Sequence, residues 1–238
     1  MTGLRLLWHR FWTRRKLERV FSRGIDAFGF EVEPYERRRL EAMESMLRNA
    51  LAGGTASSPE GGRPAPDGEM RSGAGRYRHV LELGCAEGAF TKRLCELAER
   101  VSAVDLSPLA LERASGALSR REGVRFFEAD LLSWEPAEGV RFDAVVAGDV
   151  LYYLDKPLVR EAFEEFFGRL SGWVEPGGLI LLAHGYLGDA ERSAREGYRD
   201  RLVRLGMRLA AESTVEGGGP EGKSCCLLSL LEKPPISR

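Results

Sequence analysis

Residues 79–90, HVLELGCAEGAF, constrain the fold of this chain more than any other stretch. A short apolar run carries one carboxylate, Glu82, and then breaks into a loop of small residues at 84–88. A helical pattern begins directly after the loop, at Ala89. A buried strand that ends in a glycine turn and continues as a helix is typical of the first β-turn-α unit of a parallel α/β sheet. The stretch therefore predicts a nucleotide-binding α/β domain.

The spacing of small residues in this loop separates two classes of nucleotide. Dinucleotide-binding folds use G-x-G-x-x-G, with a carboxylate about 20 positions further on. Here the small residues are Gly84, Ala86 and Gly88, so the last glycine comes one position early, and Glu82 inside the strand is foreign to that pattern. The spacing argues against an NAD-dependent oxidoreductase. A simple strand-to-helix turn without a ligand is the plain structural alternative.

The second predicted strand, 101–105, ends in a carboxylate, Asp105. This residue follows Glu82 by 23 positions, at the end of the strand expected beside the first. Two carboxylate oxygens match two vicinal hydroxyl donors, so Asp105 can accept both hydroxyls of a bound ribose. A turn aspartate at a strand end is the alternative.

Polar residues also follow the fourth and fifth predicted strands, 142–147 and 179–183. Asp149 comes shortly after the former, and His184 directly after the latter. In parallel α/β sheets, ligands bind in the crevice at the carboxyl ends of the strands. Both side chains are thus candidates for proton transfer, whereas a turn cap for Asp149 and a structural histidine are the alternatives.

Motifs spread along the chain resemble those of a known enzyme family. E-x-G-x-[GA]-x-G at 82–88, A-D-L at 129–131 and FDAVVAGDVLYYL at 142–154 resemble the class I S-adenosylmethionine (SAM) dependent methyltransferases. F-x-x-x-P-Y-E-x-x-R at 30–39 and C-C-L-L-S-L-L-x-x-P at 225–234 resemble the NodS-like methyltransferases in particular. A member of that family N-methylates a sugar amine on a chitooligosaccharide.

The resemblance implies a Rossmann-like fold: a seven-stranded, mainly parallel sheet with helices on both faces and additional N-terminal helices. It implies SAM as the cofactor, and an adenine site in which Asp130 accepts from the exocyclic amine while the Leu131 main-chain N–H meets a ring nitrogen. The implied cofactor-binding residues are Glu82, Gly84, Cys85, Ala86, Gly88, Phe90, Asp105, Leu106, Asp130 and Leu131.

The resemblance also implies where a methyl acceptor binds. Asp149 and His184 become the catalytic candidates, and Tyr35, Arg39 and Tyr152 the substrate-binding candidates. Transfer is then a direct displacement that needs alignment rather than a metal or a covalent intermediate. The family usually continues its histidine as H-W-R, whereas this chain has H-G-Y at 184–186, which leaves the sugar substrate and a role in oligosaccharide biosynthesis open.

The N-terminal segment 4–21 is basic and aromatic. The residues expected to form one apolar helical stripe are Leu4, Leu7, Trp8, Phe11 and Trp12. Packing of this stripe on the chain's own domain, or a poorly ordered terminus, is the favoured interpretation. A membrane-surface or partner-docking helix is the alternative. The net charge of −1 gives no strong attraction to nucleic acid, and no apolar run has the length of a bilayer span.

Composition divides the chain into four expected parts: an N-terminal helical lid segment (1–52), a disordered Gly- and Pro-rich linker (53–76), the SAM-binding domain (77–233) and a frayed tail (234–238). The four cysteines lack zinc-like spacing and the start lacks a signal peptide, so we expect a cytoplasmic protein with reduced thiols. The predicted activity is SAM-dependent methyl transfer to a small molecule, an amine being the first candidate. O- or C-methylation and a non-catalytic SAM-binding module are the alternatives.

Overall fold

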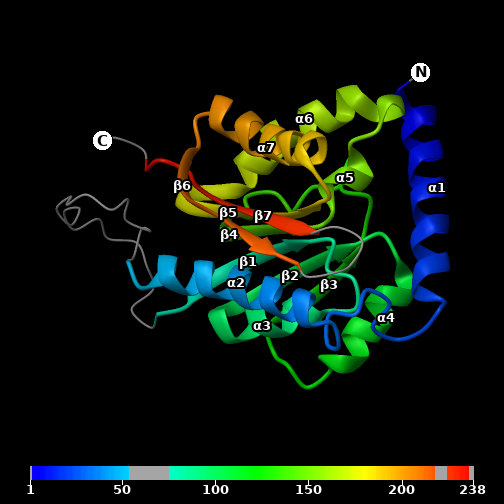
Figure 1. Ribbon diagram of the computed structural model, residues 1–238, viewed down its shortest axis with the longest axis horizontal. Coiled ribbons are helices and arrows are strands. Elements are labelled where there is room, and N and C mark those ends of the chain that lie inside the picture. Colours follow the sequence, from blue (N-terminus) through cyan, green and yellow to red (C-terminus); the bar gives the residue numbers. More distant parts are fainter. Residues whose placement is uncertain (1, 54–74, 218–223, 236–238) are drawn as a thin grey trace.

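The computed structural model describes residues 2–53, 75–217 and 224–235 of the chain (Figure 1). Most of the expected linker 53–76, residues 218–223 and the last residues of the expected tail lie outside the described residues. Within them, none of the helices combines the length and the apolar character that crossing a bilayer requires.

The described strands form one seven-stranded sheet in the order β3-β2-β1-β4-β5-β7-β6. Among the described strands, β7 alone runs opposite to the rest and pairs antiparallel with both β5 and β6, so the expectation of a mainly parallel Rossmann-like sheet is confirmed. The strands are β1 Tyr77–Leu83, β2 Ala98–Asp105, β3 Val124–Glu128, β4 Phe142–Gly148, β5 Val174–Tyr186, β6 Arg208–Glu216 and β7 Cys225–Glu232. The strand order reverses between β1 and β4, which is the position where such sheets bind ligands.

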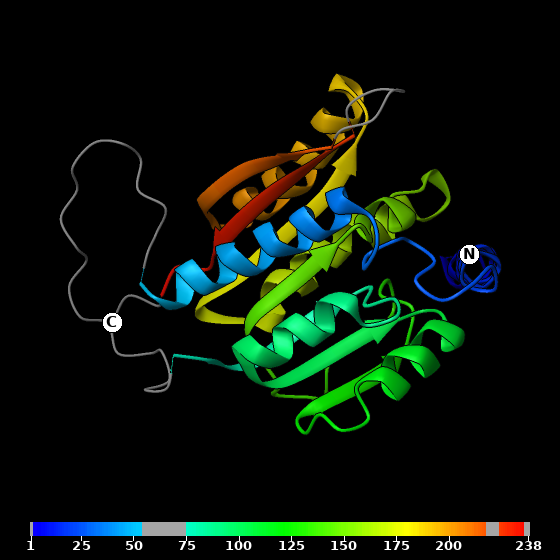
Figure 2. The same cartoon turned by 60° about the horizontal axis from the view of Figure 1, so that its bottom comes forward.

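Helices cover both faces of the sheet (Figures 1 and 2). Alternate residues of β1 belong to different cores: Val80 packs with α2 and α3, and Leu81 packs with α6 and α7. Burial on both faces explains why this strand is apolar almost throughout. The helices are α1 Thr2–Phe21, α2 Pro34–Leu51, α3 Ala89–Leu97, α4 Pro108–Ala117, α5 Leu151–Leu154, the 3-10 turn η1 Pro157–Val159, α6 Arg160–Trp173 and α7 Asp189–Arg204.

Local chemistry fixes several of these boundaries. Pro34 occupies the first position of α2, where its missing N–H costs no hydrogen bond. The Ser107 side chain caps α4 by accepting from the Ala110 N–H. Helix α3 stops at Leu97, because parallel pairing with β1 begins as early as Ala98. Strand pairing here overrides helical periodicity.

The connection from β4 to β5 has two irregular features. Residues 175–178 lie inside β5, which begins at Val174 and pairs irregularly with β4 there. The helical stretch before β5 divides into η1 and α6.

The N-terminal helix α1 packs on its own domain with a different face from the predicted one. His9 and Phe21 are buried, with Thr13 and Leu17 half-buried between them, and these four residues recur at the i, i+4 spacing of one helix face. The predicted stripe, which includes Trp8 and Trp12, points outward and stays exposed. The basic and aromatic segment is therefore docked and also presents apolar side chains to solvent.

Candidate functional site

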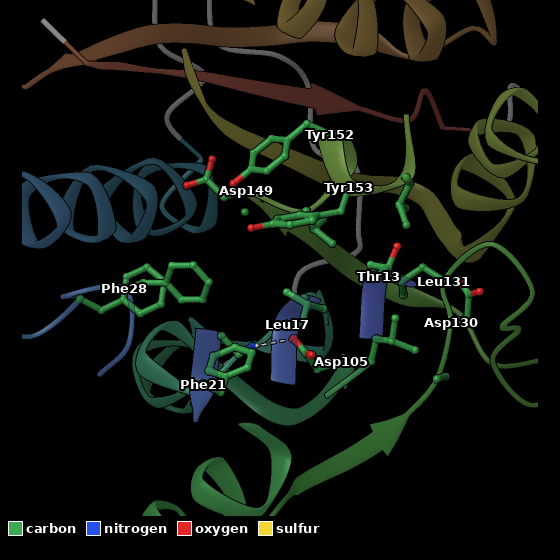
Figure 3. Close-up of a pocket in the computed structure, with 18 of the residues that line it drawn as sticks. Thr13, Leu17, Phe21, Phe28, Asp105, Asp130, Leu131, Asp149, Tyr152 and Tyr153 are labelled. Atoms are coloured by element: carbon green, nitrogen blue, oxygen red, sulfur yellow. Dashed lines mark hydrogen bonds between the residues drawn. The ribbon is translucent and has the colours of Figure 1, made fainter. Parts of the chain in front are cut away.

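A cavity of about 230 Å³ lies at the carboxyl ends of β1, β2 and β4 (Figure 3). Asp105 and Asp149 enter it from the strand ends, and Arg39 enters from α2. Leu17 and Phe21 of α1 line the same cavity. Segments far apart in the chain thus build one pocket at the point where the strand order reverses.

Asp105 is held in place by main-chain hydrogen bonds. Its Oδ2 accepts from the Ala86 N–H at 2.9 Å and its Oδ1 from the Ser107 N–H at 2.8 Å. The side chain is buried, and this burial raises its pKa, while the N–H donors of Ser107 and Ala86 act in the opposite direction. Each oxygen keeps a further lone pair for a ligand donor.

The glycine loop brings main chain to the cavity wall. Gly84 has φ +74°, and a Cβ placed there would lie 2.8 Å from Cγ2 of Val150. Ala86 also adopts a left-handed conformation, with φ +47°, and lines the cavity. Gly88 has φ +86° and packs against Ala114 of α4 instead of lining the cavity. The left-handed backbone and the close packing against Val150 together require glycine at position 84.

Glu82 lies behind this loop and does not line the main cavity. It lines a smaller adjoining cavity together with Cys85 and Phe90, and its Oε2 accepts from Thr91 Oγ1 at 2.5 Å. Burial raises the pKa of Glu82 to about 8. The two cavities share Gly84, Ala86 and Arg39 among their lining residues, so Glu82 is placed to reach one end of a ligand that spans both.

Asp130 and Leu131 line the opposite end of the main cavity, beside Thr13 of α1 (Figure 3). Asp130 is buried, and its Oδ1 accepts from the Leu132 N–H at 3.0 Å. Leu106 also lines the cavity, next to Asp105. The residues predicted to bind adenine and ribose therefore share one pocket, and their individual roles stay predictions.

A charged cluster forms another wall. Nη1 of Arg39 lies 2.8 Å from Oδ2 of Asp149, and Nε and Nη2 of Arg39 donate to Oε2 of Glu36 at 2.8 and 2.6 Å. Oδ1 of Asp149 accepts from the Gly185 N–H, and Asp149 has φ +49°. Burial raises the pKa of Glu36. One buried guanidinium thus serves two carboxylates that both line the cavity.

The predicted substrate tyrosines occupy different positions. Tyr152 lines the cavity beside Asp149, and burial raises its pKa strongly (Figure 3). Tyr35 does not line the cavity, although Arg39 and Asp149 both influence its pKa, which burial raises. Tyr153 lines the cavity as well.

His184 lies beneath the cavity wall rather than on it. Its side chain is 1% exposed, and its Nε2 accepts from the Leu151 N–H at 3.2 Å. Burial lowers the pKa of His184 to about 3. A neutral imidazole whose Nε2 lone pair is occupied by a main-chain donor is not placed for proton exchange with a ligand. His184 is therefore absent from the cavity lining, and its predicted catalytic role stays a prediction.

Four residues of α1 line the cavity, and none of them was among the predicted site residues, although a lid was expected from segment 1–52: His9, Thr13, Leu17 and Phe21. His9 is buried, and its Nε2 donates to the Tyr153 carbonyl at 3.0 Å. Its Nδ1 is then a lone-pair acceptor, and no donor for it is found among the described residues. The spacing 9, 13, 17 and 21 was visible in the sequence, but the more apolar outward stripe concealed it.

The residues that line the two cavities fit SAM. Asp105 offers two acceptor oxygens to vicinal hydroxyls, and the Gly84–Ala86 main chain lies at the cavity surface. His9 Nδ1 is a buried acceptor that an N–H or O–H of a ligand would satisfy. The polar groups are few and convergent in a mostly apolar pocket, as in other cofactor sites.

Comparison with known proteins agrees with this geometry. The family described as "Methyltransferase domain" matches residues 80–178. Nodulation protein S of Rhizobium tropici is 26% identical over 165 residues, covering 68% of this chain and 67% of that protein. Nodulation protein S of Sinorhizobium fredii is 26% identical over 161 residues, covering 67% and 72%. The structure of N-methyltransferase NodS from Bradyrhizobium japonicum with S-adenosylhomocysteine superposes with a TM-score of 0.72, at 23% identity over 93% of this chain and 98% of that one.

The matched segment runs from β1 into β5 and contains the strand ends that build the pocket. The nodulation relatives extend the likeness over two thirds of the chain, and the solved structure shares the fold. Together the matched domain, the nodulation relatives and the shared fold support a class I SAM-dependent methyltransferase that is similar to the NodS proteins.

Proposed function

We propose that this enzyme methylates an amine nitrogen of an amino sugar or a short amino-sugar oligosaccharide. The observation that carries the proposal is the cluster of Glu36, Arg39 and Asp149 at the cavity wall. With both carboxylates ionised, the cluster has one negative charge in excess, which favours an N–H donor or a cationic amine over a neutral hydroxyl or an acidic group. The likeness to solved structures of an N-methyltransferase supports nitrogen as the atom that receives the methyl group.

SAM, when bound, supplies an electrophilic methyl group. The residues of the chain hold the cofactor, align the acceptor with it and shield both from water. Asp105 holds the ribose hydroxyls through its two oxygens. Tyr152, Tyr153 and the inner face of α1 cover the cavity, which excludes water from it.

Asp149 accepts a hydrogen bond from the acceptor amine and takes up the proton that the amine must lose. Arg39 fixes the orientation of Asp149 through Oδ2, and the Gly185 N–H does so through Oδ1. His184 acts indirectly as a positioning residue, because its Nε2 holds the Leu151 N–H and thereby the segment after β4. Tyr152 is placed to contact the acceptor beside Asp149.

Matched acceptors test this proposal. The enzyme is incubated with SAM and either glucosamine oligomers or the same oligomers fully N-acetylated, and the products are analysed by fragment mass spectrometry. We expect one added methyl group, on nitrogen, for the free amine only. Methyl groups on oxygen or carbon, or equal transfer to the acetylated oligomers, would overturn the amine assignment. Cofactor binding without turnover on any acceptor would favour the non-catalytic alternative.

A further inference from the structure

The outward face of α1 is an exposed apolar surface on a helix that is otherwise docked. Its five large apolar side chains are each 53–67% exposed: Leu4, Leu7, Trp8, Phe11 and Trp12. The Trp8 and Trp12 rings stack with centroids 6.2 Å apart. The helix lies along one margin of the molecule and is seen almost end-on there in Figure 2. We call these five residues the outer stripe.

Positive charge accompanies the outer stripe. Helix α1 holds six arginines and lysines against one glutamate, whereas the whole chain has a net charge of −1, so the remainder of the protein is acidic. At about 100° per residue, Arg15 and Arg19 continue the stripe toward the C-terminal end of the helix, while Arg5 and Arg10 flank its N-terminal half. All four are exposed. The surface is therefore apolar in one half and basic in the other.

The inner face of α1 already packs on the rest of the domain, so the outer stripe is not needed for that packing. His9 donates to the Tyr153 carbonyl, and Glu18 accepts from the Ser107 hydroxyl. Arg113 of α4 donates to the Phe21 carbonyl at 3.0 Å. These contacts fix the rotation of the helix about its axis and hold the stripe outward.

We propose that the outer stripe docks the enzyme on an anionic lipid bilayer. Tryptophan and leucine side chains on one face of a basic helix suit the boundary between headgroups and acyl chains. Arginines in line with them reach lipid phosphates with their planar guanidinium groups. A second copy of the chain is a poorer occupant, because a two-fold contact at this helix would bring two equally basic surfaces together.

The docking proposal does not depend on the identity of the methyl acceptor. The outer stripe contributes none of the residues that line the cavity, so its substitution leaves the site intact. Failure of the amine assignment and failure of membrane docking are therefore separate results. Methyl transfer to a water-soluble acceptor serves as the common readout of an intact site.

Vesicle binding by the full chain tests docking. The protein is sedimented with vesicles of phosphatidylcholine, with or without about a third of phosphatidylglycerol, and tryptophan emission is recorded in parallel. We expect binding to the anionic vesicles, a blue shift of emission, and release by high salt. Trp8→Ser with Trp12→Ser reduces the partition coefficient by about tenfold or more, since two large apolar contacts are lost. Arg15→Gln with Arg19→Gln reduces it by at least about tenfold.

Matched control variants show whether the loss of vesicle binding is specific to α1. Leu187→Ser with Leu205→Ser removes exposed apolar side chains elsewhere, and Arg120→Gln with Arg125→Gln removes exposed charge elsewhere. Both controls should bind vesicles as the unsubstituted chain does. Absence of binding to the anionic vesicles, or equal binding by the Trp8 and Trp12 variant, would overturn the proposal. Concentration-dependent dimerisation that this variant abolishes would assign the surface to a second copy instead.

Discussion

The two walls of the cavity are built by different means. On the wall predicted to bind SAM, the Asp105 carboxylate is fixed by the N–H groups of Ala86 and Ser107, and Gly84 packs directly on Val150. On the wall predicted to bind the acceptor, Arg39 is fixed by the side chains of two carboxylates. One wall is main chain positioned by adjacent strands, and the other is a side-chain network between α2 and the end of β4.

Because the two walls are built differently, we expect that each can be altered without changing the other. Main-chain donors remain when a side chain on the acceptor wall changes, so the cofactor should still bind. A side-chain network leaves a buried charge unpaired when one member is lost. Within one catalytic site, we therefore expect substitutions to separate into those that affect cofactor affinity and those that affect turnover.

The largest expected effect is on turnover and comes from Asp149→Asn. Asparagine tolerates the left-handed backbone at φ +49° and can still accept from the Gly185 N–H, but it cannot take up a proton. We expect turnover with an amine acceptor to fall by about 100-fold or more, while the Kd for SAM changes by less than about threefold. Steady-state kinetics and calorimetric titration measure the two quantities.

An exposed aspartate controls for loss of charge: Asp200→Asn, on α7, should leave both quantities unchanged. If Asp149→Asn weakened SAM binding as much as it slowed turnover, the two walls would not be independent.

The second largest effect is expected on the cofactor wall, from Asp105→Ala. The change removes the acceptor for two main-chain N–H groups and for the ribose hydroxyls. Hydrogen bonds to charged groups contribute about 1.5–3 kcal/mol each, so the Kd for S-adenosylhomocysteine should rise by about 100-fold. Asp189→Ala, at the exposed start of α7, is the control in the same titration. An unchanged Kd would mean that Asp105 only holds the loop.

The cofactor wall was also the part of the site that sequence reasoning placed best. Glu82, Gly84 and Asp105 are positioned by strand ends and by one short loop, and local spacing determines such positions. The strand order follows from the same units, which is why the fold could be predicted. Whether each of these residues contacts SAM stays a prediction.

The acceptor wall could be predicted only in part, because its geometry depends on packing between distant segments. His184 follows a strand in sequence, yet its imidazole turns into the core, where Leu151 and Tyr198 enclose it. His9 reaches the cavity only because α1 docks by its less apolar face. Hydrophobic periodicity favours the more apolar stripe for burial, and no local signal in the sequence shows that a less apolar face already matches the domain.

A smaller effect is expected from Gly84→Ala, which tests close packing on the cofactor wall. Gly139 provides a matched control, because it has φ +77° against +74° for Gly84, but an added Cβ there meets no heavy atom within 4 Å. Both alanine variants carry the same backbone strain, of about 1–2 kcal/mol. Only Gly84→Ala adds the clash with Val150, so its free energy of unfolding should fall by about 2 kcal/mol more. Equal losses in denaturant titrations would show that Val150 moves aside.

The smallest effect on turnover is expected from His184→Gln, which separates positioning from proton transfer. Glutamine can still accept from the Leu151 N–H, so turnover should change by less than about threefold, and the pH profile of kcat/KM should keep its shape. Stability should respond differently. Burial lowers the pKa of His184 to about 3, against about 6.5 in the unfolded chain, so only the unfolded chain binds this proton between those values.

The contribution of neutral His184 to folding is therefore complete above about pH 6.5 and declines as the pH falls toward 3. Between pH 7 and pH 5 the unsubstituted enzyme should lose about 2 kcal/mol of unfolding free energy that His184→Gln retains, because glutamine does not titrate. Denaturant unfolding at both pH values measures this difference directly, and other titrating groups cancel between the two proteins. Parallel pH dependence of stability, together with a lost inflection in kcat/KM, would return His184 to the proton-transfer role predicted from its place after β5.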